Sequence, residues 1–248
     1  MTRLKRLCLV LLATLAPAGA ASANCRPLAH DQNTYTICTA TPGTDDIRLF
    51  HTDDADEVLG NFGRINAMLA VQGQTLSFAM NGGMYHPDRS PVGLYIEDGV
   101  QKRAAVTRSG PGNFGMLPNG VFCLTDTTAQ VIETRAYAAN PPACRFATQS
   151  GPMLVIDGAL HPRFLPDSTS RNIRNGVGVT EAGEVIFAIS DQAVTFDEFG
   201  RLFRDVLHTP NALFLDGKVS RLFAPDLNRN DLGLPLGPIV GVVVPQTR

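Results

Sequence analysis

The sequence predicts a single domain of the α+β, or mixed α/β, class, with a mixed but mostly antiparallel sheet and a few packed helices. Short apolar segments alternate with turns rich in Gly, Pro and Asp, which is typical of strands joined by short connections. Residues 61–71 and 195–207 instead repeat apolar side chains at helical spacing. The chain has 248 residues, of which 44% are hydrophobic, and this length suffices to bury one full core.

The first 23 residues have the features of an export signal. A basic start precedes an apolar run over residues 7–16, and residues 21–23, Ala-Ser-Ala, fit the small-x-small cleavage rule. The run is too short for a comfortable membrane span, so we expect no stable membrane insertion. Cleavage leaves residues 24–248 as a periplasmic or secreted domain. Cys25 beside the cut raises the alternative of a lipid anchor, which Asn24 disfavours because a lipoprotein cut follows a small residue.

The expected mature chain is acidic. Cleavage removes three basic residues and no acidic one, so the formal charge falls from −2 to −5. Proteins that bind nucleic acid need a basic face to meet the phosphates. We therefore expect no nucleic-acid partner.

Four cysteines remain after cleavage: Cys25, Cys38, Cys123 and Cys144. Three pairings are possible. The local one, Cys25–Cys38 with Cys123–Cys144, closes two short loops, each worth about 3 kcal/mol. An exported chain with an even cysteine count favours structural disulfides over metal binding. The chain has no metal-ligand spacing of Cys or His, no phosphate-binding Gly-rich loop and no dinucleotide fingerprint, so we expect neither metal nor cofactor.

The first half of the chain predicts four strands and one helix. Residues 61–71 place Phe62, Ile65, Met68 and Leu69 at helical spacing. The expected strands are residues 33–40, 46–51, 76–80 and 92–97.

The second half predicts a hairpin, a helix and several buried strands. Residues 136–145, rich in Ala and Pro, are expected to form a loop. Thr195 and Glu198 form a capping-box signature at the start of an amphipathic helix that Pro210 ends. Asp157-Gly158 and Ala182-Gly183 are expected at hairpin turns. The expected strands are residues 121–124, 130–134, 152–156, 184–190, 212–215 and 238–244.

Charged and polar residues stand where several strands end. Asp191 and Asp216 each follow a buried strand, and the strand–helix–strand unit between them can place their strands side by side. Paired carboxylates perform acid/base or nucleophilic work at a glycosidic bond, and an Arg such as Arg174 holds phosphate by a bidentate fork. The alternative is that each Asp only forms a turn. Gly217 follows Asp216 and allows close approach of a ligand.

Two more segments are candidates for the same site. Asn81-Gly82-Gly83 follows a short apolar strand, where glycines allow a ligand to approach the backbone; a plain tight turn is the alternative. Ser150 lacks the Gly-x-Ser-x-Gly context of a nucleophile and is better suited to hydrogen bonding. His86, beside the Asn-Gly-Gly turn, is a proton shuttle or, more simply, a surface residue.

The motifs taken together, in their order and spacing over residues 76–221, resemble those of the phosphodiester glycosidase family, whose best-known relatives are the lysosomal uncovering enzymes. The matching segments are Asn81–Tyr85, Gly93–Gly99, Ser150–Leu154, Arg174 with Gly178, and Ala212–Gly217 with Ser220. Two positions depart from the family pattern. Lys218 and Val219 replace glycines of a Leu-Asp-Gly-Gly-Gly-Ser motif, and Gln192 follows Asp191 where a glycine is common in eukaryotic relatives.

The resemblance implies an exported hydrolase that cleaves a sugar phosphodiester or a related envelope or exopolysaccharide glycan linkage. In this hypothesis Arg174 grips the anionic group, and Asp216 and Asp191 are the acid/base or nucleophile candidates. The substrate-binding candidates are Asn81, Gly82, Gly83, Ser150 and Gly217. The alternative is a non-enzymatic exported factor with the same fold that binds or assembles polysaccharide.

Overall fold

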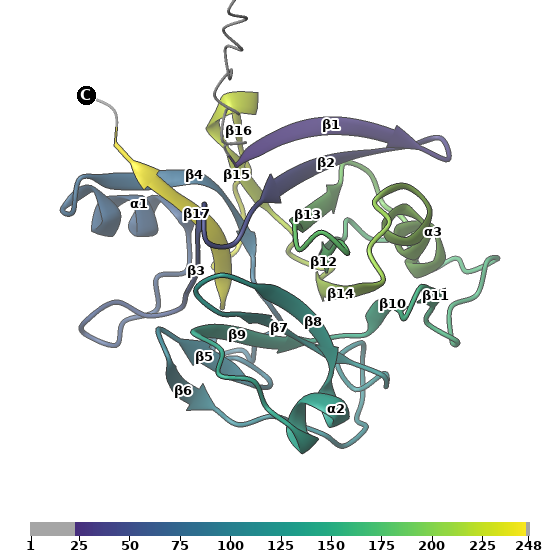
Figure 1. Ribbon diagram of the computed structural model, residues 1–248. Helices are drawn as coiled ribbons and strands as arrows, with labels where there is room; N and C mark the ends of the chain where they lie inside the picture. The colour runs from purple at the N-terminus through teal and green to yellow at the C-terminus, as the bar shows by residue number, and fades with distance from the viewer. Residues whose placement is uncertain (1–22, 247–248) are drawn as a thin grey trace, which may run out of the picture.

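Three β-sheets share one apolar core in the computed structural model, which describes residues 23–246 (Figure 1). Phe187 stands at the meeting point of the sheets. Its ring lies 5.6 Å from that of Phe78 and 5.8 Å from that of Phe122, and each of these three residues belongs to a different sheet. Burial of these rings and their aliphatic neighbours holds the sheets together.

The largest sheet has seven strands in the order β1-β2-β13-β12-β14-β10-β11. Its strands are β1 (Asn24–His30), β2 (Asn33–Ala40), β13 (Val185–Ser190), β12 (Asn175–Val179), β14 (Asn211–Asp216), β10 (Met153–Ile156) and β11 (Ala159–Leu160). The second sheet runs β16-β15-β4-β17-β3 and the third β6-β5-β9-β7-β8. Their strands are β16 (Arg229–Asn230), β15 (Leu222–Ala224), β4 (Gln74–Asn81), β17 (Ile239–Pro245), β3 (Asp46–Phe50), β6 (Val100–Arg103), β5 (Tyr95–Glu97), β9 (Phe146–Ser150), β7 (Gly120–Leu124) and β8 (Ala129–Glu133).

A helix packs on the outer side of each sheet (Figure 1). Helix α1 (Phe62–Ala70) packs on the second sheet, and Asn61 caps it by accepting from Arg64 N. Helix α3 (Phe196–Arg201) continues as a π-helical turn, Leu202–Val206, over the seven-stranded sheet. Helix α2 (Thr134–Ala139) places Tyr137 against the third sheet.

The α+β expectation is correct in part. All strand pairs within the three sheets are antiparallel, and the chain is richer in sheet (42% strand, 13% helix) than a balanced α+β protein. The single mixed sheet of the sequence prediction is therefore replaced by three.

Residues 134–139 form helix α2 where a loop was expected over residues 136–145, because the Glu133 side chain caps its N-terminus. Strand β1 was not predicted. The predicted export signal lies almost entirely outside the described residues.

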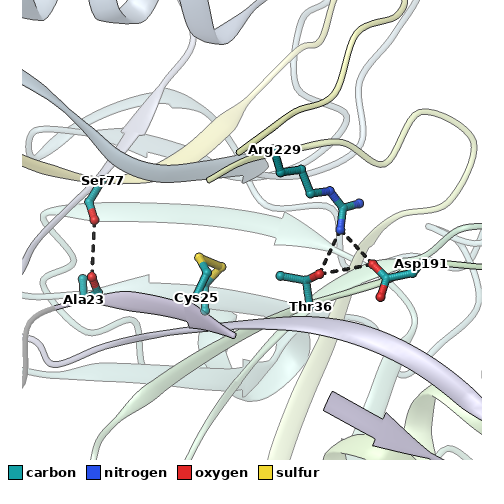
Figure 2. Close-up of a disulfide and its surroundings, with 7 residues drawn as sticks. Ala23, Cys25, Thr36, Ser77, Asp191 and Arg229 are labelled. Carbon is teal, nitrogen blue, oxygen red and sulfur yellow. Dashed lines mark hydrogen bonds and ion pairs between the residues drawn. A yellow bond between two sulfur atoms is a disulfide. The ribbon is translucent and has the colours of Figure 1, made fainter. Parts of the chain in front are cut away.

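Both disulfides follow the local pairing. Cys25 and Cys38 face each other across the β1–β2 hairpin (Figure 2), and Cys123 of β7 bonds to Cys144 ahead of β9. A disulfide at Cys25 leaves no thiol there for a lipid. Two disulfides indicate an oxidising compartment. Among residues 23–246, no helix is long and apolar enough to cross a membrane.

Candidate active site

Asn81 joins the second sheet to the seven-stranded sheet at the end of β4. The side chain is fully buried, and its Nδ2 donates to Asp216 Oδ2 (3.3 Å) and to Val219 O (3.0 Å). Its Oδ1 accepts from Arg221 N (2.8 Å), while its backbone carbonyl accepts from Asn175 Nδ2 (2.9 Å). One amide thus uses both its donor and its acceptor to fix the segment that follows β14.

Asp216 ends β14 and is the carboxylate that this arrangement presents. It is 8% exposed. Its Oδ1 accepts from the backbone N–H groups of Gly217 and Lys218. Burial raises the pKa of Asp216 above its ordinary value of 3.8, while hydrogen bonds from the turn and from Asn81 oppose that rise. A carboxylate with a raised pKa is suited to exchange a proton nearer neutral pH.

Arg174 lies one residue before β12 and is 1% exposed. Nε donates to Val194 O (2.9 Å) and Nη2 to Ser170 O (3.0 Å), and the guanidinium carbon sits 3.7 Å from the centre of the Phe196 ring. Burial lowers the pKa of Arg174 to about 10, so the side chain stays charged at neutral pH. Within the described residues Nη1 is fully buried and has no hydrogen-bond partner.

Gly217 separates Arg174 from the cavity described below. A Cβ at this position would stand 2.9 Å from Phe214 Cζ and 3.7 Å from Arg174 Nη1. The buried, unpartnered Nη1 therefore lies next to Gly217, which lines the cavity. The N–H groups of Gly217 and Lys218 point at Asp216, so in this turn they orient the carboxylate.

A cavity of about 880 Å³ opens at Asp216. Its walls are the segment after β4, the loop that follows Arg103, and the turn after β14. Asp216 is the single carboxylate among the described residues that line it, and three lining residues are cationic: Arg103, Arg108 and Lys218. An acidic chain therefore surrounds one buried carboxylate with positive charge, which favours an anionic ligand.

The two glycines after Asn81 are packed into the fold. A Cβ on Gly82 would lie 2.9 Å from the backbone of Ile239 and Val240, and Gly82 N donates to Pro238 O. Gly83 has φ +155°, and a Cβ there would lie 2.6 Å from Thr148 Oγ1. The structure thus gives both glycines a packing reason, and their substrate-binding role stays a prediction.

Ser150 lies under the site. It is fully buried, and its hydroxyl donates to Leu215 O (3.0 Å), the residue before Asp216. This bond fixes the end of β14 against β9. The structure places Ser150 where it positions Asp216, and contact with substrate remains a prediction.

Asp191 follows β13 at the same edge of the seven-stranded sheet as Asp216, but the two strands are not neighbours. Strand β12 separates the strands that end at the two residues, so the expected side-by-side placement is wrong. Asp191 Oδ1 accepts from Arg229 Nη1 (2.8 Å) and from Thr36 Oγ1 (3.2 Å) (Figure 2). This paired, one-third exposed carboxylate has the contacts of a surface ion pair.

Several residues of the site escaped the sequence reasoning. Tyr85 lines the cavity. Arg221, whose backbone N–H donates to Asn81 Oδ1, is buried to 7% exposure with Nε and Nη2 unpartnered within residues 23–246. The sequence signal for Tyr85 was its place in the Asn81–Tyr85 motif, and Arg221 only follows Ser220 of the last motif. His86 does line the cavity, with Nε2 3.2 Å from Arg103 Nη2.

Comparison with known proteins identifies the family of this chain. The family model described as phosphodiester glycosidase matches residues 74–241, which span Asn81, Ser150, Arg174 and Asp216. The chain belongs to the phosphodiester glycosidase family. A relative from Escherichia coli strain K12, the uncharacterized protein YigE, is 36% identical over 220 residues, which cover 89% of this chain and 85% of YigE.

Two solved structures, from zebrafish and Synechocystis, have a similar fold. The catalytic domain of zebrafish N-acetylglucosamine-1-phosphodiester alpha-N-acetylglucosaminidase, auto-inhibited by its pro-peptide, superposes with a TM-score of 0.60 at 12% identity, covering 89% of this chain and 82% of that one. A hypothetical protein from Synechocystis has a TM-score of 0.58 at 14% identity, over 89% of this chain and 61% of that one. At such identities the likeness concerns the fold.

Proposed function

We propose that this protein is an exported hydrolase that cleaves the glycosidic bond of a sugar phosphodiester, with Asp216 as the reacting carboxylate. The observation that carries the proposal is a cavity with a single described carboxylate, Asp216, among several cations. Family membership supports hydrolysis at a sugar phosphodiester.

The leaving group explains why one carboxylate is enough. Most glycosidases use two, because an alkoxide must be protonated as it leaves. A phosphate monoester has a second pKa of about 6, so it departs without a strong acid. Positive charge that stabilises the departing phosphate then takes the place of the second carboxylate.

In the proposed reaction Asp216 acts as a general base. A water molecule attacks the anomeric carbon while Asp216 takes its proton, and the electron pair of the broken glycosidic C–O bond leaves with the phosphate oxygen. The raised pKa of Asp216 suits this role. The positive charge of Arg174, which lies next to Gly217, attracts the phosphate. The hydrogen bond from Asn81 keeps the Asp216 carboxylate in place.

Export is part of the proposal. The disulfides, the predicted signal over residues 1–23 and the likeness to a Burkholderia pseudomallei protein described as exported (TM-score 0.55, 11% identity, covering 85% of this chain and 74% of that one) support a periplasmic or secreted location. An envelope or exopolysaccharide glycan-phosphate is then the class of substrate that the protein meets.

The test uses purified wild type and Asp216→Asn on a panel of sugar phosphodiesters and phosphate-bearing envelope polymers, followed by ³¹P NMR. We expect conversion of phosphodiester to phosphomonoester by wild type and a loss of at least about 10³-fold with Asp216→Asn. Asp191→Asn is the matched comparison, because its ion pair with Arg229 lies apart from the cavity, and it should keep most of the activity. Equal rates for wild type and Asp216→Asn would remove Asp216 from the mechanism. A wild type that binds these polymers without cleaving any would favour the non-enzymatic alternative.

A further inference from the structure

Arg221 is a buried cation that forms no ion pair with the residues described by the structure. The residue is 7% exposed, and within residues 23–246 its Nε and Nη2 are fully buried without a hydrogen-bond partner. Removing a guanidinium from water costs several kcal/mol unless a partner compensates. Arg229, by contrast, has such partners: its guanidinium donates hydrogen bonds to Asp231, Thr36 and Asp191.

The nearby carboxylates are already engaged by other donors. Asp231 accepts from Arg229 and from Leu222 N. Asp216 accepts from Asn81 and from the turn after β14. Arg221 therefore has guanidinium donors to offer to a group that comes from outside the protein.

Arg221 is not among the described residues that line the cavity, but it is hydrogen-bonded to the residue that holds Asp216. Its backbone N–H donates to Asn81 Oδ1, the other end of the amide that holds Asp216. Burial raises the pKa of Tyr85, which lines the cavity; the charge of Asp216 adds to that rise, and the charges of Arg89 and Arg221 oppose it. A Cβ at Gly233 would stand 3.4 Å from Arg221 Cδ, 3.6 Å from Nε and 3.7 Å from Cζ, so the absence of a side chain at Gly233 makes room for the arginine.

We propose that Arg221 is a second anion-binding residue of this site and holds the phosphate-bearing group of the ligand beside Asp216. Arg174 reaches the site from the seven-stranded sheet, whereas Arg221 reaches it from the start of the second sheet's β15. The ligand class that fits is a sugar phosphate, because two guanidiniums match the charge and the several acceptor oxygens of a phosphoryl group. The inference deepens the proposed function, yet it concerns binding and is measured without turnover.

The experiment is calorimetric titration of the full mature chain with glucose 1-phosphate, and with glucose as the uncharged probe. We expect Arg221→Met to raise the Kd for glucose 1-phosphate at least about tenfold, as loss of a charge-assisted hydrogen bond does, and to leave the weak response to glucose unchanged. Arg221→Lys should recover part of the affinity. The melting temperature should stay equal or rise, because an uncompensated buried cation is gone.

Arg229→Met is the matched control, since it removes a guanidinium from the adjacent strand β16 that has protein partners. It should lower stability and keep the Kd for glucose 1-phosphate. A Kd for Arg221→Met within a factor of two of wild type, or an equal loss in Arg229→Met, would overturn the inference. If wild type binds glucose 1-phosphate through Arg221 but hydrolyses no phosphodiester, Arg221 keeps its role and the proposed function fails.

Discussion

Asp216 is buried beside groups that stabilise its ionised form, yet burial prevails and its pKa rises. A folded-state pKa above the unfolded value of 3.8 means that the folded protein holds this proton to higher pH than the unfolded chain does. Protonation of Asp216 therefore contributes to the free energy of unfolding. This contribution is fully present below pH 3.8 and is lost as the pH rises through the raised pKa of the folded protein. The ionised residue thus lowers the stability of the folded protein at the pH where the proposed base would act.

Asp216→Asn should remove this pH dependence, because the amide mimics the protonated acid. We expect the melting temperature of Asp216→Asn, relative to wild type, to increase as pH rises from 4 to 7. Differential scanning calorimetry across that range measures the difference. A difference that is constant with pH would mean that Asp216 titrates at its ordinary pKa.

Arg174 is expected to matter more for activity than for folding. Arg174→Met keeps a long apolar side chain against Phe196 and removes a guanidinium whose Nη1 has no described partner. We expect kcat/KM for a phosphodiester to fall by about 10²–10³ and the melting temperature to fall moderately, because Val194 O and Ser170 O lose their donors. Arg174→Lys, which keeps the charge but lacks the fork, should lie in between. Undiminished activity in Arg174→Met would assign the residue to structure alone.

At the scale of elements, the Asn-Gly-Gly segment acts as a junction between sheets. Gly82 packs against the backbone of β17, where the nearest atoms, Ile239 C and Val240 N, cannot rotate away from an added Cβ. The junction therefore depends on a missing side chain as much as on the hydrogen bonds of Asn81.

Gly82→Ala should destabilise the protein by about 1–3 kcal/mol through overpacking. Urea unfolding measures the change. Gly110→Ala is the control, because a Cβ at Gly110 meets nothing within 4 Å. Equal urea midpoints for the two variants would show that the backbone around Gly82 accommodates a Cβ without loss of stability, and would contradict this account.

Local signals account for the elements that the sequence predicted well. Thr195 and Glu198 form the expected capping box, and Asp157-Gly158 forms the expected turn between β10 and β11. Such signals act within four residues. Strand β1 and helix α2 lacked them: β1 is defined by its pairing with β2, and α2 is capped by a Glu.

The site was only partly predictable because local sequence signals reveal strand ends, whereas tertiary packing decides which strand ends meet. Asn81, Arg174, Asp216 and Gly217 stand at strand ends, which sequence reveals, and the fold brings them together. Asp191 also follows a strand, but sheet order decides its neighbours, and β12 lies in between. The role proposed for Arg221 rests on donors that have no partner among residues 23–246, which depends on tertiary packing.

At the scale of the whole molecule, three sheets depend on one shared core, and the disulfides restrain its edges. Cys123–Cys144 spans 21 residues and ties β7 to the segment before β9. Replacing both of these cysteines by Ser should lower the free energy of unfolding by about 3 kcal/mol. Urea titration of the oxidised proteins measures the loss. An unchanged midpoint would mean that the core alone fixes the third sheet.

Hydrolysis of a sugar phosphodiester in H₂¹⁸O tests the central claim most directly, because it reports which bond breaks. If Asp216 directs water to the anomeric carbon, ¹⁸O enters the hydroxyl of the released sugar and the phosphate keeps its original oxygens. Mass spectrometry of both products locates the label. Label in the phosphate would identify cleavage of the P–O bond and contradict a glycosidase mechanism at Asp216.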